Sequence, residues 1–146
     1  MAKSEQSGFT AAEKAAMKAR AQELKKEARA KDKKAAGEKD ALEKIAEMPK
    51  TDRDIAQRVH AIVKEHAPDL AAKTMYGMPA YANEAGTVVC FFQAAAKWDT
   101  RYATLNFDHP AKLDDGDMWP TSFAIVRLTP AVEERIVELV KRAVGS

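Results

Sequence analysis

The stretch Met75-Tyr76-Gly77-Met78-Pro79-Ala80-Tyr81 carries the most structural information in this sequence. It holds two tyrosines, two methionines, a glycine and a proline just before a strand-like run. Gly77 permits a positive φ and Pro79 fixes φ, so the pair predicts a fixed bend. Met78, which precedes the proline, is directed toward an extended conformation. Four large apolar side chains on such a bend are either buried together or exposed together as a binding surface.

Length, charge and cysteine content bound the kind of protein. The chain has 146 residues and a net charge of +2, which fits one domain with or without an appendage. Its single cysteine, Cys90, cannot form an internal disulfide and suits a reducing compartment. No apolar run approaches the roughly 18 residues of a membrane helix, and residues 1–6 lack the apolar core of a signal peptide. We therefore expect a soluble, cytoplasmic protein that has no membrane contact and is a monomer.

The composition of residues 10–36 predicts a helix with almost no large apolar side chains. Met17 and Leu24 are the two exceptions, and the remainder is Ala, Lys, Arg, Glu, Gln and Asp. Thr10 and Glu13 have the spacing of a capping box, which marks the start of the helix. Because alanine buries little area, we expect a solvated helix that is dispensable for folding.

Gly37 is the predicted stop or hinge of this helix, so it separates an extension, residues 1–37, from a domain, residues 38–146. The extension is basic: up to Glu47 there are 12 Lys and Arg against 9 Asp and Glu. Such a helix can lie along a phosphate backbone. However, acids alternate with lysines along the sequence, so we expect no purely cationic stripe, and no aromatic is present to stack on bases. Nucleic-acid binding is therefore the alternative interpretation and a solvated helix the favoured one.

Two amphipathic helices are predicted next. Residues 38–48 place Ala41, Leu42, Ile45 and Ala46 on one face, and Pro49 ends the helix. Thr51 is the predicted cap of the second helix, which Pro68 stops. Its buried stripe consists of Ile55, Val59, Ile62 and Val63.

In the residues that follow, the hydrophobic side chains repeat with the period of strands. Residues 86–93, 98–107 and 122–128 are rich in β-branched and aromatic residues, and the second run alternates, with Ala103, Leu105 and Phe107 on one side. Thr129-Pro130 begins a closing helix whose buried stripe is Val132, Ile136, Leu139 and Val140. Short connections predict an antiparallel sheet with helices on one face. The expected fold is α+β, in two layers.

Residues from about Thr51 to Val144 resemble the YdhG-like family of small bacterial domains. The resemblance is carried by Ala67-Pro68, by the block from Tyr76 to Tyr81, by the strand from Val88 to Gln93 and by the late strand that runs into Thr129-Pro130. It implies an α-β-α order with a curved antiparallel sheet, similar in outline to frataxin. Some members are described as frataxin-like iron chaperones, so iron handling is an implied function.

Frataxin-like iron handling is attributed to acidic surface on the first helix. Here that helix is mixed, with Arg53, Arg58 and Lys64 beside Asp52, Asp54 and Glu65. The densest cluster of hard ligands lies later, on a loop: Asp108, His109, Asp114, Asp115 and Asp117. Carboxylates on a loop suit hard cations at low affinity, although a solvated turn has the same composition. We expect no resident cofactor, and iron only as a weakly held ion.

No motif of an enzyme is present. Cys90 lies in the most apolar run of the chain, between Val89 and Phe91, where a thiol is buried and unreactive. His60 and His66 are six residues apart, so they do not share a helical face as a ligand pair, and we place both at the surface or its boundary. Gly-x-Ser-x-Gly elbows, phosphate loops and dinucleotide fingerprints are missing. The sequence predicts a protein that is not an enzyme.

A group of aromatic and thioether residues in or beside turns remains as a candidate binding surface. Its members are Tyr76, Met78, Tyr81, Trp98 and Trp119, with Lys97 and Arg101 flanking Trp98 as charged anchors. Apolar walls with a few polar anchors are typical of pockets for small molecules or peptides. In the other interpretation Tyr76 and Met78 only plug the open end of the sheet. The leading hypothesis is a non-catalytic binding or chaperone-type domain with a small-molecule or peptide partner.

Overall fold

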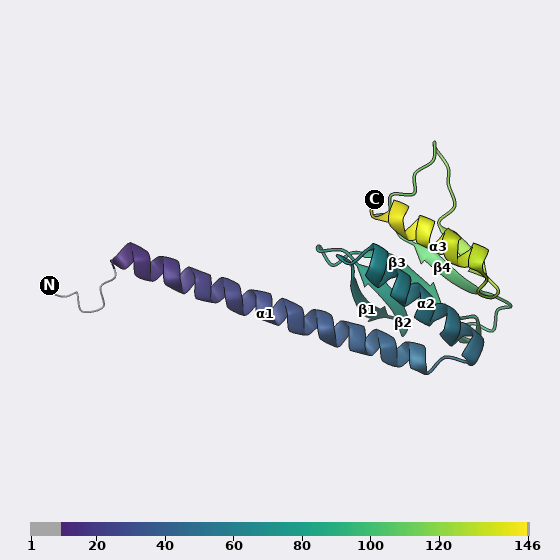
Figure 1. Ribbon diagram of the computed structural model, residues 1–146, viewed down its shortest axis with the longest axis horizontal. Helices are drawn as coiled ribbons and strands as arrows, with labels where there is room; N and C mark the ends of the chain where they lie inside the picture. Colours follow the sequence, from purple (N-terminus) through teal and green to yellow (C-terminus); the bar gives the residue numbers. More distant parts are fainter. Residues whose placement is uncertain (1–9, 146) are drawn as a thin grey trace. The chain divides into compact units, whose positions relative to one another are not determined.

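The computed structural model describes residues 10–145 (Figure 1). Residues 1–6, on which the prediction about a signal peptide rests, lie outside this range. The chain divides into two compact units, one ending at Ala35 and one beginning at Ala36. Helix α1, Ala11–Ala46, contributes to both units, which are described separately. Among the described residues, no helix is both long and apolar enough to cross a membrane.

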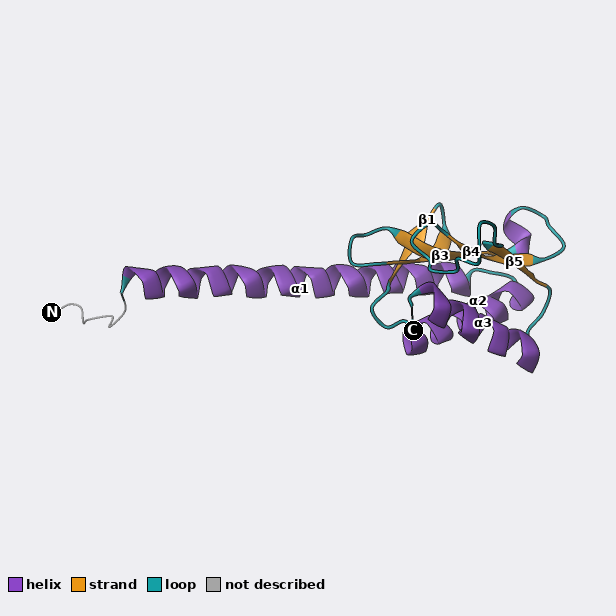
Figure 2. Cartoon of the chain, turned by 90° about the horizontal axis from the view of Figure 1, so that it is seen from above, coloured by secondary structure: helices purple, strands orange, loops and turns teal. Residues whose placement is uncertain are grey.

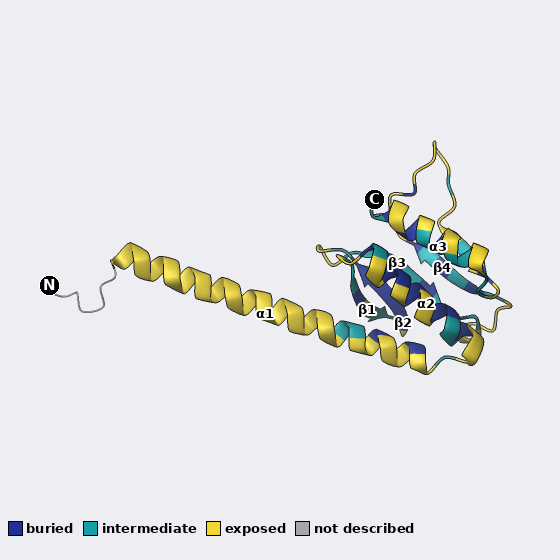
Figure 3. Ribbon diagram, viewed as in Figure 1, coloured by how far each residue is buried: buried dark blue, intermediate teal, exposed yellow. Residues whose placement is uncertain are grey.

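The first unit is helical over its described length, and every residue from 11 to 35 is exposed (Figure 3). The predicted capping box is confirmed. The Glu13 backbone N–H donates to Thr10 Oγ1 at 3.0 Å, and the Thr10 N–H donates to Glu13 Oε1 at 2.9 Å. Met17 and Leu24 are 54% and 49% exposed, so neither is part of a core.

The prediction that Gly37 stops the helix is wrong, because α1 continues through it to Ala46. A β-carbon at position 37 would lie 2.5 Å from the carbonyl oxygen of Ala72. Glycine is therefore required for the close approach of α1 to the sheet, and its helix-weakening tendency is overridden by tertiary contact. The predicted face of residues 38–48 is half right: Ala41 and Ile45 are buried, whereas Leu42 and Ala46 are exposed.

The second unit is a two-layer α+β domain, which confirms the predicted fold class. Its sheet has five antiparallel strands in the order β1-β2-β3-β4-β5, so each strand pairs with the next one along the chain. Their bounds are Ala71–Met75, Met78–Ala82, Val88–Gln93, Ala103–Phe107 and Ser122–Ile125. Helices α2, Lys50–His66, and α3, Pro130–Ala143, cover one face of the sheet (Figure 2).

The stretch of residues 75–81 is a tight β-hairpin. Tyr76 and Gly77 form its two-residue turn, with φ values of 51° and 77°, between the paired residues Met75 and Met78. This confirms the predicted bend and the extended conformation at Met78. Pro79 lies inside β2, opposite Thr74, and the ladder to β3 begins one residue later. A proline is tolerated there because that position needs no N–H donor in either ladder.

Several predicted boundaries change. Residues 98–107 are not one strand, because a turn that follows η1, Ala95–Lys97, occupies the start and β4 begins only at Ala103. The predicted alternation is confirmed within β4, where Ala103, Leu105 and Phe107 are buried. The last strand ends at Ile125 rather than at residue 128. Thr51 is not a cap, since α2 begins at Lys50 with no side-chain cap hydrogen bond.

The core lies between the helices and the sheet. The predicted stripe of α2 is buried throughout, and that of α3 is buried except for Val132, which is partly buried. Tyr81 and Phe92 are the bulkiest fully buried side chains of the sheet. Glu133 on α3 forms an ion pair with Arg58 on α2, which ties the two helices together at their surface.

Candidate functional site

The connection between β4 and β5, residues 108–121, is the longest one in the sheet, and it is tied to the domain at several points. At its start, the Asp108 N–H donates to the Val89 carbonyl at 2.8 Å. In its middle, the Lys112 N–H donates to the Ala143 carbonyl, also at 2.8 Å, which holds the loop beside the end of α3 (Figure 1). These bonds give the loop a fixed position although it contains no helix or strand.

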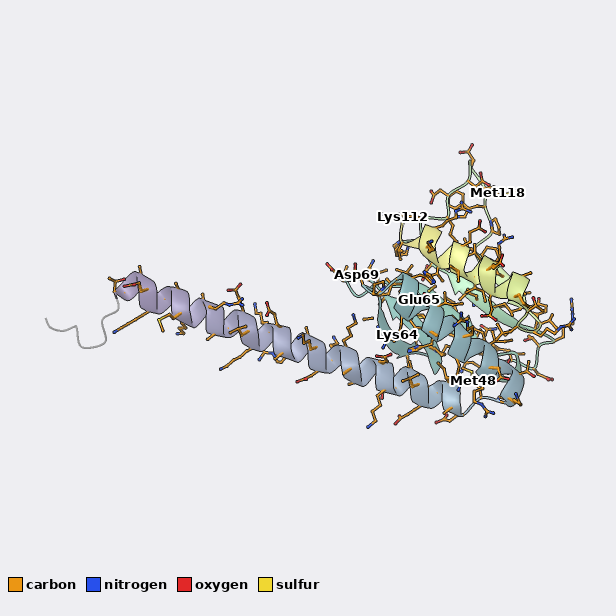
Figure 4. The ribbon with its side chains drawn as sticks, in the orientation of Figure 1. Met48, Lys64, Glu65, Asp69, Lys112 and Met118 are labelled. Atoms are coloured by element: carbon orange, nitrogen blue, oxygen red, sulfur yellow. The ribbon has the colours of Figure 1, made fainter. Side chains whose placement is uncertain are left out.

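Buried side chains anchor the same loop. Ala111 is 8% and Leu113 is 4% exposed, and Trp119 is partly buried against the core. Met118, by contrast, is 88% exposed on the loop (Figure 4). The loop therefore alternates between residues that hold it and residues that face solvent.

A hollow with a volume of about 490 Å³ lies at this loop. We call it the loop hollow. Aromatic and aliphatic side chains form most of its wall, and two carboxylates, an imidazole and a hydroxyl supply its polar groups. Its lining comprises Phe107, Asp108, His109, Ala111, Leu113, Asp117, Met118, Trp119 and Thr121. Apolar walls with a few polar groups are the usual composition of a small-molecule site.

The loop hollow contains three of the five predicted metal ligands. Asp108, His109 and Asp117 line it, whereas Asp114 and Asp115 are exposed residues outside the lining. One Asp108 oxygen, Oδ1, accepts the His109 backbone N–H at 2.8 Å. Within residues 10–145, no three His, Cys, Asp or Glu side chains lie close enough together to hold a metal ion. The arrangement thus offers an acidic rim, which favours a cationic group.

The residues predicted to bind a ligand do not form one surface. Trp119 lines the loop hollow, and Met78 lines a second hollow of about 310 Å³. This second one, the hairpin hollow, lies between the β1–β2 turn and the junction of α1 with α2, where Met48 and Pro49 contribute. Tyr81 is 1% exposed and belongs to the core.

Tyr76, Trp98 and Arg101 are exposed, and none of them lines the hairpin hollow. Tyr76 is 85% and Trp98 61% exposed. Lys97 links the turn to Trp98: its Nζ lies 5.7 Å from the indole centroid and 3.4 Å from where a Gly77 β-carbon would be. Arg101 stacks on Tyr102 instead, with 5.2 Å from Cζ to the ring centroid. The predicted plug is therefore Met78 alone, and Tyr76 is at the surface.

A buried polar network runs from Tyr81 to the surface. His60, predicted at the surface or boundary, is only 6% exposed. Its Nε2 lies 2.9 Å from Glu38 Oε2, and its Nδ1 lies 3.0 Å from the Tyr81 hydroxyl oxygen, so both ring nitrogens have hydrogen-bond partners. Lys64 Nζ donates to the same Glu38 oxygen at 2.6 Å. Sequence spacing could have found His60, since it follows Ala56 by four residues and precedes Val63 by three on the buried face.

The surroundings of this network shift the pKa values of its Glu38 and Tyr81 side chains. Hydrogen bonds from Lys64 and then His60 lower the pKa of the Glu38 carboxyl. Burial raises the pKa of the Tyr81 hydroxyl far above its usual value, so it stays protonated. Burial also raises the pKa of the Cys90 thiol to about 12, in agreement with its predicted lack of reactivity.

Asp52 is a buried acid that sequence reasoning placed at the surface. It is 5% exposed, and its two carboxylate oxygens accept the backbone N–H groups of Ala95 at 2.9 Å and Ala96 at 3.1 Å. Asp52 therefore fixes η1 beside α2 and is not part of an acidic outer face.

Comparisons of the chain with protein-family models, with curated proteins and with solved structures find no match.

Proposed function

We propose that residues 36–146 form a non-catalytic binding domain that takes a small ligand, or a side chain of a peptide, in the loop hollow. Three features support this function: the volume of about 490 Å³, the apolar wall around Trp119, and the way the loop is tied to Val89 and Ala143. A site that is already formed loses little conformational entropy on binding. A chaperone-type role in the cytoplasm would use the same hollow to hold an apolar side chain.

The polar groups of the hollow point to the charge of the ligand. Asp108 and Asp117 stand at its rim, and its lining contains neither lysine nor arginine. A ligand with a flat apolar body and a positive group would stack on Trp119 and place its charge beside a carboxylate. An anionic ligand of the same shape would be repelled.

The test compares two ligands that share one ring and differ in charge, tryptamine and indole-3-acetate. Amide NMR titration should show tryptamine shifting signals around Trp119 and Asp117, with indole-3-acetate leaving them in place. Trp119→Ala should abolish the shifts. Asp117→Asn should weaken tryptamine binding up to about fivefold, the range of an exposed ion pair.

Asp114→Asn is the matched control, because it removes the same charge from the same loop outside the lining. It should leave the affinity unchanged. Equal affinity for the two ligands, or shifts centred on Trp98 and the hairpin hollow, would refute the assignment to the loop hollow.

Iron handling, which the YdhG-like resemblance implies, is a second proposal with weaker support. The one observation in its favour is that Asp108, His109 and Asp117 line the same hollow. Anaerobic titration with ferrous iron should broaden their amide signals only at high metal excess. Broadening along Asp54 and Glu65 on α2 would favour a frataxin-like surface instead, although Asp52 is occupied by η1.

A further inference from the structure

Helix α1 carries a basic stripe that is not visible in the order of the sequence. Residues 11–35 contain nine Lys and Arg against four Asp and Glu, a net charge of +5 in a chain whose total is +2. At 3.6 residues per turn, five of these cations fall within roughly 100° of one another around the helix axis. We call them the basic stripe: Lys14, Lys18, Lys25, Arg29 and Lys33.

Three of the four acids of residues 11–35 lie elsewhere on the helix. Glu13, Glu23 and Glu27 project from the opposite side, whereas Asp32 lies within the angular range of the stripe, beside Lys33 near its end. Glu27 forms an ion pair there with Arg20, at 3.9 Å. The stripe is thus not purely cationic, as expected, because it includes Asp32, but the other three acids alternate with lysines only along the sequence and lie away from the stripe around the helix.

The stripe is accessible to solvent and has a net positive charge. All five members are exposed, and within residues 10–145 none of them forms an ion pair. Successive members are four or seven residues apart, so their charges recur every 6 to 10 Å over about 28 Å of helix. Gln22, which has a neutral polar side chain, lies between Lys18 and Lys25, the two members that are seven residues apart.

We propose that the basic stripe binds the phosphate backbone of duplex nucleic acid without reading its sequence. A row of cations at regular spacing suits a regular row of phosphates, whose counterions it displaces. Residues 11–35 contain no aromatic residue, so this segment cannot stack on single-stranded bases.

A lipid surface is disfavoured by the other face of the same helix. A helix that lies on a membrane buries a broad apolar face rich in Trp, Phe and Leu. Over residues 11–35 the only large apolar side chains are Met17 and Leu24, and the rest of that face is alanine. This inference concerns a different ligand and a different unit from the loop hollow, so either can fail alone.

The experiment measures anisotropy of a labelled duplex of about 20 base pairs, longer than the roughly eight base pairs that the stripe spans. The full chain should bind at 50 mM salt, with a log–log salt slope of roughly −4 to −5 for five phosphate contacts. Affinity should then fall on the order of 500-fold between 50 and 200 mM salt. Duplexes of different sequence should bind equally.

Two double variants distinguish binding through the basic stripe from a general effect of net charge. Lys18→Gln with Lys25→Gln should reduce the slope by about 2 and weaken binding at 50 mM salt at least about tenfold. Arg20→Gln with Lys31→Gln removes the same charge from the other side and should change affinity by less than about threefold. Circular dichroism confirms equal helicity, since glutamine is a good helix former.

Equal weakening by the two double variants would overturn the stripe, and so would the absence of a complex at 50 mM salt. Tighter binding to the matching single strand would overturn the assignment to a duplex. Binding to phosphatidylserine vesicles in place of DNA, with the same dependence on Lys18 and Lys25, would replace nucleic acid by a lipid surface and refute the proposal.

Discussion

Residues 11–35 and residues 36–46 belong to one helix, yet different forces hold the two segments. The first segment is stabilised locally, by helix-forming residues, the capping box of Thr10 and Glu13, and pairs along its own surface. The second is held by tertiary contact, through Gly37 against Ala72 and Glu38 against His60. Continuous secondary structure therefore does not imply uniform stability, and a helix can change from scaffold to appendage within one turn.

The largest expected difference in stability is between two variants in which a methionine is replaced by alanine. Met78 is 7% exposed in the domain, whereas Met17 is 54% exposed on the extension. Met78→Ala should lower the free energy of unfolding by about 2–5 kcal/mol through the cavity it leaves. Met17→Ala should change it by less than about 0.5 kcal/mol. Urea denaturation measures both, and a small loss for Met78→Ala would show that this side chain is an open wall of the hairpin hollow.

Gly37 provides the next contrast. On an exposed helix, Gly→Ala stabilises by about 1 kcal/mol. At position 37 the added carbon meets backbone, so Gly37→Ala should instead destabilise the domain by about 1–3 kcal/mol. The opposite change in the extension, Ala30→Gly, should lower helicity by circular dichroism and leave the urea midpoint in place. A stabilised Gly37→Ala protein would mean that α1 does not approach β1 closely.

Truncation tests at which residue of α1 the contribution to the stability of the domain begins. Residues 10–35, the part of this segment that the structure describes, are all exposed, so removing residues 1–35 should cost the domain at most about 1 kcal/mol at roughly 25 cal/mol per Å². Removing residues 1–40 also takes away Gly37 and Glu38, and should cost measurably more. Both are compared with the full chain by urea unfolding at one pH. Equal stabilities of the two truncated proteins would place the boundary beyond residue 40.

The smallest contrast is between two glutamates at low pH. Glu38 and Glu13 both have a pKa below the ordinary value of 4.5. A carboxyl whose pKa is lowered on folding contributes stability above its unfolded pKa, and this stability is lost as the pH falls through the lower folded value. Below about pH 4.5, loss of the Glu38 charge should therefore reduce global stability, and Glu38→Gln should remove that part of the pH dependence. Protonation of Glu13 should only fray the start of α1, as seen by circular dichroism.

Local patterns predicted most of the fold. The buried stripes of α2 and α3 and the alternation in β4 follow from the periods of helices and strands, which need no knowledge of the partner element. The positive φ at Gly77 and the capping box at Thr10 are also local. The strands β1 and β2 were missed, because β2 is buried throughout, contains Pro79 and so lacks the usual signature of a strand.

The missed features depend on contacts between distant residues. His60 lies 21 residues from Tyr81, and Asp52 lies 43 residues from Ala95, so each polar side chain is satisfied by a partner that no local pattern reveals. The same holds for the candidate site. The sequence showed Asp108, Asp117 and Trp119 near one another, but the folded loop decides which of them share a hollow and which face solvent.

Gly37 also bears on how the chain avoids aggregation. β1 is an edge strand, and the alternation of its ladder with β2 directs the Ala72 carbonyl toward the open side of the sheet. An open edge is a template for pairing with another molecule, and the close approach of α1 at Gly37 covers this one. At the opposite edge, β5 relies on its short length of four residues. A bulkier residue at position 37 should therefore expose β1 and accelerate aggregation at high protein concentration, an effect that light scattering can follow separately from any loss of folding stability.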